Sequence, residues 1–194
     1  MLDLAIIIGH RRGSQGAGAN GLTEYGFHSD FALELAEACQ EAGLSVAVVE
    51  RDDTPDGYAL LPARVNALAP RFAISLHLNA HDSNASGSEA LYWHTSRGDM
   101  NGDGVPDRSC ALASMLQEAQ CDALGLKDRG LKPIQKGHRG WYLLANTSMT
   151  CALLEPCFVS NAYDVTTLLE RRRELASALA TAAAEYSRIL GGSR

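Results

Sequence analysis

The stretch Leu4-Ala5-Ile6-Ile7-Ile8-Gly9-His10 joins five apolar residues to a glycine and an imidazole. Short apolar runs rich in Ile, Leu and Ala and bounded by Gly, Pro or Asn are typical of buried strands. Two further runs follow the same plan, since Phe72 to Leu76 stops at His77 and Cys151 to Leu154 stops at Glu155. Ligands of open α/β sheets gather outside the carboxyl ends of such strands. The three strand ends therefore predict one site.

Helical segments alternate with these strands. Thr23 is a suitable N-cap for a helix over Glu24–Ala42, and Gly43 would end it. We expect further helices over Gly57–Leu68, Ser109–Leu124, Ala162–Leu169 and Arg172–Leu190, the last closed by Gly191-Gly192, and further strands over Leu44–Glu50, Ser88–Trp93, Leu131–Ile134 and Trp141–Leu144. This alternation predicts a layered α/β domain with a mostly parallel or mixed sheet.

A glycine-rich segment from Gly9 to Gly21 follows the first strand. It contains neither the Gly-Lys-Ser/Thr of a P-loop nor a G-x-G-x-x-G sequence before a helix. We therefore expect a flexible loop here rather than a phosphate-binding site.

Composition sets limits on the class of protein. A chain of 194 residues that is 46% hydrophobic can bury the core of one domain, 1–194. A net charge of −6 and 6% aromatic residues argue against nucleic-acid binding, and Arg171-Arg172-Arg173 is interpreted as a solvated helix face. No run reaches the roughly 18 apolar residues of a membrane span. We expect a monomer. We also expect reduced, mostly buried thiols, because the five cysteines are odd in number and include no Cys-x-x-Cys pair.

His10, Glu24 and His77 are the residue types of a hydrolytic zinc site. Such a site has three protein ligands and leaves the fourth position to water, whose pKa falls toward neutrality. These three residues would sit on separate rigid elements, which fixes the geometry of a metal site. Taken singly, the two imidazoles could be ordinary loop histidines and Glu24 a helix-capping residue.

Glu155 is the fourth residue of this group. A carboxylate that follows Leu153 and Leu154 is expected to be desolvated, which would raise its pKa and suit it to moving a proton. The alternative is a buried acid paired with an arginine such as Arg139.

Seven short motifs occur in a fixed order along the chain. They are Ile8-Gly9-His10, Gly16-Ala17, Thr23-Glu24, Glu50-Arg51, Arg64-Val65-Asn66, Ser75-Leu76-His77-Leu78-Asn79-Ala80 and Leu154-Glu155-Pro156-Cys157-Phe158-Val159-Ser160-Asn161. From about Leu4 to Leu190 the chain resembles the zinc-dependent N-acetylmuramoyl-L-alanine amidases of the Amidase_3 type. Ser-x-His-x-Asn-Ala and Glu-x-x-Phe-x-Ser-Asn are the most specific motifs.

The resemblance implies that His10, Glu24 and His77 bind one zinc ion and that Glu155 is the catalytic carboxylate. It also implies a single catalytic domain with a six-stranded mixed sheet flanked by helices. The substrate would be peptidoglycan, cleaved between the lactyl group of N-acetylmuramic acid and L-alanine of the stem peptide. Further candidates for residues that support the ligands or contact substrate are Asn79, Ser75, Arg64 and His81.

Two motifs depart from the family's usual pattern. The first usually reads Asp-x-Gly-His-Gly-Gly, whereas this chain lacks the Asp and has Arg11-Arg12 after the histidine. Pro156-Cys157 replaces the common glycines after Glu155, and Cys157 is interpreted as a buried apolar residue rather than a nucleophile. These arginines could alter substrate contacts, but they leave the ligand assignment intact.

The segment from Asp99 to Asp107 resembles the start of a calcium-binding loop. Oxygen ligands would come from Asp99, Asn101, Asp103 and Asp107, with Gly104 at the sharp turn. The twelfth position is Cys110 instead of the bidentate glutamate. A surface loop is therefore favoured over a calcium site.

No secretory signal is visible at the start of the sequence. We expect synthesis in the cytoplasm and action on the cell wall after release, as for a phage endolysin. Two alternatives stay open: a zinc peptidase or amidohydrolase that acts on another acyl-amino acid amide, and a non-catalytic cell-wall-binding relic.

Overall fold

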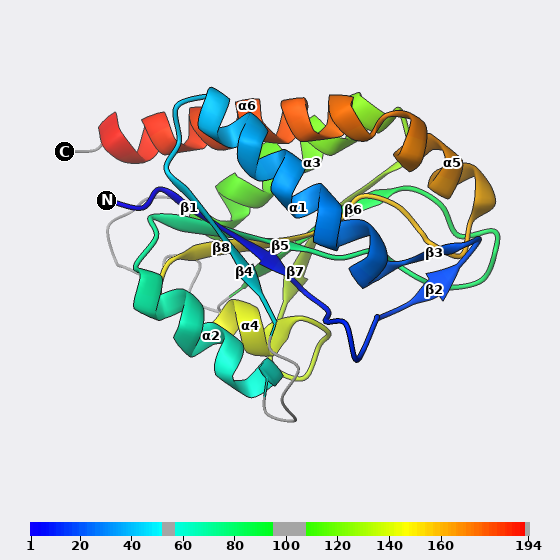
Figure 1. The fold of residues 1–194 in the computed structure, drawn as a ribbon, viewed down its shortest axis with the longest axis horizontal. Helices are drawn as coiled ribbons and strands as arrows, with labels where there is room; N and C mark the ends of the chain where they lie inside the picture. The colour runs from blue at the N-terminus through cyan, green and yellow to red at the C-terminus, as the bar shows by residue number, and fades with distance from the viewer. Residues whose placement is uncertain (52–56, 95–107, 193–194) are drawn as a thin grey trace.

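A six-stranded sheet runs through the centre of the computed structural model, which describes residues 1–51, 57–94 and 108–192 (Figure 1). Its strands lie in the order β4-β1-β5-β8-β6-β7. Neighbouring strands are parallel except that β6 runs antiparallel to β8. The bounds are Leu4–Ile8 for β1, Val46–Glu50 for β4, Phe72–Leu76 for β5, Ser88–Trp93 for β6, Asp128–Ile134 for β7 and Thr150–Glu155 for β8. The expected mixed, mostly parallel sheet is confirmed.

Helices cover both faces of this sheet, as the sequence predicts. In Figure 1, α1, α3 and α6 lie over one face, and α2 and α4 lie over the other. The bounds are Glu24–Glu41 for α1, Gly57–Leu68 for α2, Arg108–Leu124 for α3, Trp141–Asn146 for α4, Ala162–Glu170 for α5 and Arg172–Gly192 for α6. Within the described part of the chain, none of the helices combines the length and apolar character that crossing a membrane requires.

The central strands are buried on both faces, which explains their unbroken apolar sequences. In β1, Leu4, Ile6 and Ile8 belong to the core beneath α1, α3 and α6. The alternate residues Ala5 and Ile7 belong to a second core beneath α2 and α4. The sheet is therefore held by apolar packing from both sides, and its strand ends are rigid supports for polar side chains.

The prediction of a strand over Trp141–Leu144 is wrong, because these residues form the first part of helix α4. The predicted strand has only four residues, and at that length periodicity cannot distinguish a buried strand from a buried helical turn. Gly140, the N-cap residue, has a left-handed conformation with φ of 72° and turns the chain into the helix. Leu143 and Leu144 then pack into the core beneath this helix.

The glycine-rich segment forms regular structure where the sequence favoured a flexible loop. β2 (Gly18–Ala19) and β3 (Leu22–Thr23) pair as a small antiparallel hairpin. Thr23 caps α1 as expected, and its hydroxyl accepts a hydrogen bond from the Gly26 amide at 3.1 Å. At the other end of the chain, α6 extends through Gly192 rather than ending before the glycine pair. The candidate calcium ligands Asp99, Asn101, Asp103 and Asp107 lie outside the described residues.

The strand order brings polar residues from five strands to one edge of the sheet. β1, β5 and β8 are parallel neighbours, so their carboxyl ends meet there. Because β6 is antiparallel to β8, it begins at the same edge, and Glu89 lies opposite Glu155 in the register. β7 is parallel to β6, so its first residues, including Arg129, also lie at this edge.

Candidate metal centre and active site

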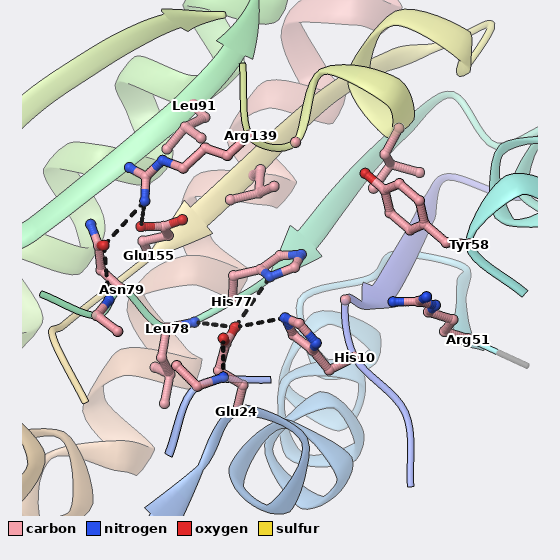
Figure 2. A pocket seen from close by; sticks show the side chains of 16 residues that line it. His10, Glu24, Arg51, Tyr58, His77, Leu78, Asn79, Leu91, Arg139 and Glu155 are labelled. Atoms are coloured by element: carbon pink, nitrogen blue, oxygen red, sulfur yellow. Dashed lines mark hydrogen bonds and ion pairs between the residues drawn. The ribbon is translucent and has the colours of Figure 1, made fainter. Parts of the chain in front are cut away.

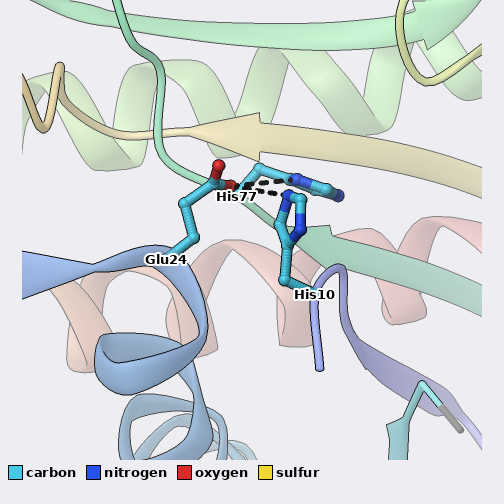
Figure 3. A group of neighbouring side chains, drawn as sticks. All are labelled: His10, Glu24 and His77. Carbon is cyan, nitrogen blue, oxygen red and sulfur yellow. Dashed lines mark hydrogen bonds and ion pairs between the residues drawn. The ribbon is translucent and has the colours of Figure 1, made fainter. Parts of the chain in front are cut away.

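His10, Glu24 and His77 converge just beyond the carboxyl ends of β1 and β5 (Figure 3). One carboxylate oxygen, Glu24 Oε2, lies 3.3 Å from His10 Nε2 and 3.2 Å from His77 Nδ1. The three ligand atoms all lie within 4.8 Å of one another. His77 follows β5 directly, His10 follows β1 after Gly9, and Glu24 lies in the first turn of α1. The sequence-predicted ligands are therefore together in space.

Close backbone approach makes room for this cluster. A Cβ on Gly9 would lie 2.0 Å from His77 Nε2, so only glycine fits between β1 and that ring. Gly16 has φ of 77°, a conformation that favours glycine, and a Cβ there would lie 2.7 Å from the His10 ring. Both glycines belong to the segment that follows β1, so this segment shapes the group formed by His10, Glu24 and His77.

Backbone amides hold Glu24 in place. Its Oε1 accepts a hydrogen bond from the Ala17 amide at 2.9 Å, and its Oε2 accepts one from the Leu78 amide at 3.0 Å. Burial of Glu24 by itself would raise its pKa, but hydrogen bonds with His10 and His77 outweigh burial and hold the pKa well below its ordinary value. The carboxylate is therefore ionised and oriented toward both imidazoles.

This donor set fits a zinc ion. Tetrahedral zinc with nitrogen and oxygen ligands at about 2.0–2.2 Å places neighbouring ligand atoms about 3.4 Å apart. The separations of 3.2 and 3.3 Å between Glu24 and the two histidines are close to that value. Two neutral imidazoles and one carboxylate would also leave net positive charge on a divalent ion. Three protein ligands leave one position of a tetrahedral site for water or substrate.

Glu155 lines the same cleft, which has a volume of about 420 Å³ (Figure 2). It is the last residue of β8 and is 5% exposed. Burial raises its pKa to about 7, against the opposing effect of the Arg139 guanidinium. A carboxyl group with a pKa near neutrality can both accept and return a proton at physiological pH.

Arg139 contacts Glu155 directly, as one sequence interpretation suggested. Its Nη1 donates to Glu155 Oε2 at 2.8 Å and to Asn79 Oδ1 at 3.1 Å. Its Nη2 donates to Glu89 Oε1 at the start of β6. The Asn79 amide Nδ2 donates to the same Glu89 oxygen at 2.7 Å. The pairing with Arg139 does not remove Glu155 from the cleft, because both side chains line it.

The other candidate residues are placed differently. Asn79 lines the cleft, where it joins Glu89 to Arg139. Ser75 is fully buried within β5 and does not line the cleft. Arg64 is exposed on α2, outside the cleft lining. The His81 side chain is 72% exposed and pairs with Asp82 at 3.1 Å, also outside the cleft lining.

Sequence interpretation gave no role to the opposite wall of the cleft. Arg51 and Tyr58 line it, with the guanidinium carbon 4.9 Å from the centre of the tyrosine ring (Figure 2). Glu50-Arg51 was noted only as a motif. Glu89 and Arg129 were also missed, although the position of Glu89 at the start of an apolar strand was a usable signal.

Comparison with known proteins places the chain in a family. The sequence model of Amidase_3, described as N-acetylmuramoyl-L-alanine amidase, matches residues 4–185. The chain belongs to this family. The amidase LytC of Bacillus subtilis is 29% identical to it over 163 residues, which are 82% of this chain and 30% of LytC. This amidase domain therefore spans less than a third of that relative.

Solved structures show the same fold. The catalytic domain of CwlV, an N-acetylmuramoyl-L-alanine amidase from Bacillus (Paenibacillus) polymyxa var. colistinus, is similar with a TM-score of 0.76 and 24% identity, covering 96% of this chain and 98% of that one. The catalytic domain of the CD27L endolysin, which targets Clostridia difficile, is similar with a TM-score of 0.75 and 23% identity, covering 95% and 98%. The chain thus has the same fold as the catalytic domains of these two proteins.

Proposed function

We propose that this protein hydrolyses peptidoglycan at the amide bond between the lactyl group of N-acetylmuramic acid and L-alanine of the stem peptide. The observation that carries the proposal is the presence of Glu155 in the same cleft as His10, Glu24 and His77. Membership of the Amidase_3 family supports the choice of bond and of zinc as the metal.

His10, Glu24 and His77 would hold the metal. When bound there, a zinc ion supplies positive charge that polarises the amide carbonyl and lowers the pKa of water. The hydrogen bonds from the Ala17 and Leu78 amides to Glu24 keep this ligand in one orientation while substrate enters. Because Gly9 and Gly16 leave no space beside the imidazoles, the two histidines are restricted in the same way.

Glu155 would act as general base and then as general acid. Its ionised carboxylate takes one proton from the attacking water, whose oxygen forms a bond to the carbonyl carbon. The bond from that carbon to the alanine nitrogen then breaks, and Glu155 returns the proton to the departing nitrogen. The products are a lactyl carboxylate and a stem peptide with a free amino group, so one water is consumed.

Digestion of purified peptidoglycan, followed by mass spectrometry of the products, tests this proposal. Four samples are compared: zinc-loaded protein, chelator-treated protein, chelator-treated protein to which zinc has been added back, and zinc-loaded Glu155→Gln. We expect stem peptides that begin with L-alanine, formed only with metal and lost in Glu155→Gln. Cuts inside the stem peptide would instead support a zinc peptidase. Binding to peptidoglycan without cleavage by zinc-loaded protein would support a wall-binding relic.

Release from the cytoplasm in the manner of an endolysin stays a prediction. It is tested by producing the chain in bacteria with and without a protein that opens the membrane. Lysis that requires membrane opening is the expected result, and lysis without it would contradict the prediction.

A further inference from the structure

Arg139 contacts two carboxylates, Glu155 and Glu89, which differ in their access to the cleft. Figure 2 shows its contact with Glu155. Nη1 donates to Glu155 Oε2 at 2.8 Å, and Nη2 donates to Glu89 Oε1. The Glu155 side chain lines the cleft, whereas Glu89 is 2% exposed and does not line it. The Arg139 side chain is itself 49% exposed, so burial does not hold it. Its position depends on these polar contacts.

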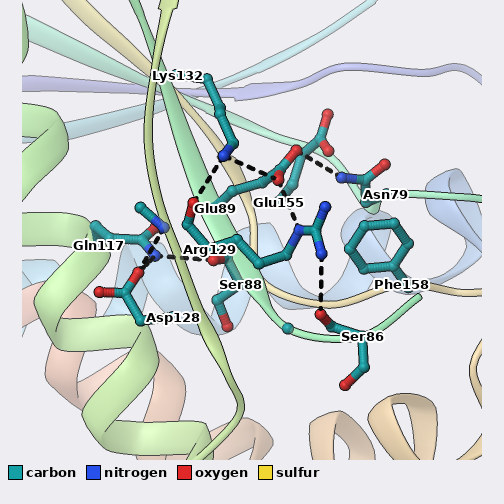
Figure 4. A network of polar contacts seen from close by, with 12 residues as sticks. Asn79, Ser86, Ser88, Glu89, Gln117, Asp128, Arg129, Lys132, Glu155 and Phe158 are labelled. Carbon is teal, nitrogen blue, oxygen red and sulfur yellow. Dashed lines mark hydrogen bonds and ion pairs between the residues drawn. The ribbon is translucent and has the colours of Figure 1, made fainter. Parts of the chain in front are cut away.

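Glu89 is fixed by groups other than Arg139. The Arg129 Nε donates to Glu89 Oε2 at 2.9 Å, and Lys132 Nζ lies 3.9 Å from the same oxygen (Figure 4). The Asn79 amide donates to Oε1 at 2.7 Å. Arg129 is held in turn, because its guanidinium lies 4.7 Å from the centre of the Phe158 ring. Glu89 is therefore a rigid buried anion at the edge of the sheet.

This arrangement leaves the two oxygens of Glu155 in different states. Oε2 accepts the hydrogen bond from Arg139 Nη1. Within residues 1–51, 57–94 and 108–192, Oε1 accepts no hydrogen bond from the protein. A hydrogen bond to one oxygen limits rotation of the carboxylate and leaves the other oxygen for a water proton.

We infer that Arg139, anchored by Glu89, is a positioning residue that orients Glu155 so that Oε1 exchanges the proton with water and the alanine nitrogen. This inference rests on the proposed function, since it assigns a partner to the general base. It explains why a buried glutamate with its own arginine and lysine lies opposite the catalytic carboxylate in the sheet. Arg139 itself acts through Glu155 and needs no contact with substrate.

The arrangement also predicts how the neighbouring charges change the pKa of Glu155. The charged groups that bear on it are Arg139 from the loop before α4, Glu89 from β6 and Glu24 from α1, with the imidazoles of His10 and His77 in the same cleft. Arg139 lowers the pKa of Glu155, and Glu89 raises it. Loss of Arg139 should therefore move the acidic limb of the pH–rate profile to higher pH, and loss of Glu89 should move it to lower pH.

The test compares kcat, KM and the pH profile of Arg139→Met, Arg139→Lys and Glu89→Gln on a soluble N-acetylmuramoyl-L-alanyl peptide. Arg139→Met should lower kcat by about 10- to 100-fold with little change in KM, because Glu155 loses its orientation. The acidic limb of the pH–rate profile of Arg139→Met should move to higher pH. Arg139→Lys should move the limb back toward wild type but restore kcat only in part, since a lysine ammonium lacks the planar fork of two nitrogens with which Arg139 contacts Glu155 and Glu89. Glu89→Gln should move the limb to lower pH and reduce kcat.

Arg188→Met is the matched control, because Arg188 is exposed on α6 and does not line the cleft. Zinc content and melting temperature are measured for every variant. A kcat within twofold of wild type and an unmoved limb in Arg139→Met would overturn the inference, as would limbs that move the same way in Arg139→Met and Glu89→Gln. If Glu89→Gln does not fold, the kcat values and pH profiles of the two Arg139 variants test the inference. Full activity in Glu155→Gln would instead overturn the proposed function.

Discussion

Glu155 should lower the stability of the metal-free protein at alkaline pH. Its pKa rises from 4.5 to about 7 on folding, chiefly because of burial. Between these values the folded protein binds more protons than the unfolded chain, so the free energy of unfolding must fall as pH rises. Since each pKa unit corresponds to about 1.36 kcal/mol, the full effect is on the order of 3 kcal/mol. Glu155→Gln removes this titration and resembles the protonated side chain.

The assay is urea unfolding of metal-free wild type and Glu155→Gln at pH 4 and pH 8.5. The free energy of unfolding of Glu155→Gln minus that of wild type should be larger at pH 8.5 than at pH 4, by up to roughly 3 kcal/mol. Other titrating groups are shared by both proteins, so their effects cancel in the difference. Glu185→Gln, at an exposed position on α6, is the control and should show no such increase. A relative stability that is the same at both pH values would refute the argument that Glu155 is held in a desolvating site.

Further predictions concern the metal centre and the reaction. Glu24→Gln should reduce bound zinc from about one ion per chain to nearly none, measured by elemental analysis, and retained zinc would contradict the ligand assignment. Gly16→Ala should weaken zinc binding at least tenfold in a competition titration, because a Cβ would lie 2.7 Å from the His10 ring; unchanged affinity would show that the loop can shift. In kcat profiles, activity should fall as pH drops below about 7, where Glu155 becomes protonated, and a flat profile from pH 5 to 8 would exclude it as the base.

The three candidate metal ligands could be predicted from the sequence because each follows a recognisable element. His10 and His77 end short apolar runs, and Glu24 comes directly after a helix cap, so their convergence required only that β1 and β5 be parallel neighbours. Glu155 could be predicted in the same way. Strand ends are readable when the strand is buried on both faces, since the apolar run then stops abruptly at the polar residue.

The supporting network could not be predicted, because it depends on strand direction. Glu89 comes close to Glu155 only because β6 runs antiparallel to β8, and no local pattern in Ser88–Trp93 specifies that direction. Arg139 was anticipated as a partner of Glu155, but its bond to Glu89 was not. The helix at Trp141 was missed for a related reason, since four apolar residues fit a buried strand and a buried helical turn equally well.

The role of Glu155 is tested most directly by the turnover of a defined N-acetylmuramoyl-L-alanyl peptide by zinc-loaded wild type and zinc-loaded Glu155→Gln, with bound zinc quantified in both. We expect wild type to release a muramoyl lactyl carboxylate and a peptide with a free L-alanine amino group. We expect Glu155→Gln to bind the same amount of zinc and to release neither product at a measurable rate. Equal rates in the two proteins at equal zinc content would contradict the assignment of Glu155 as the general base.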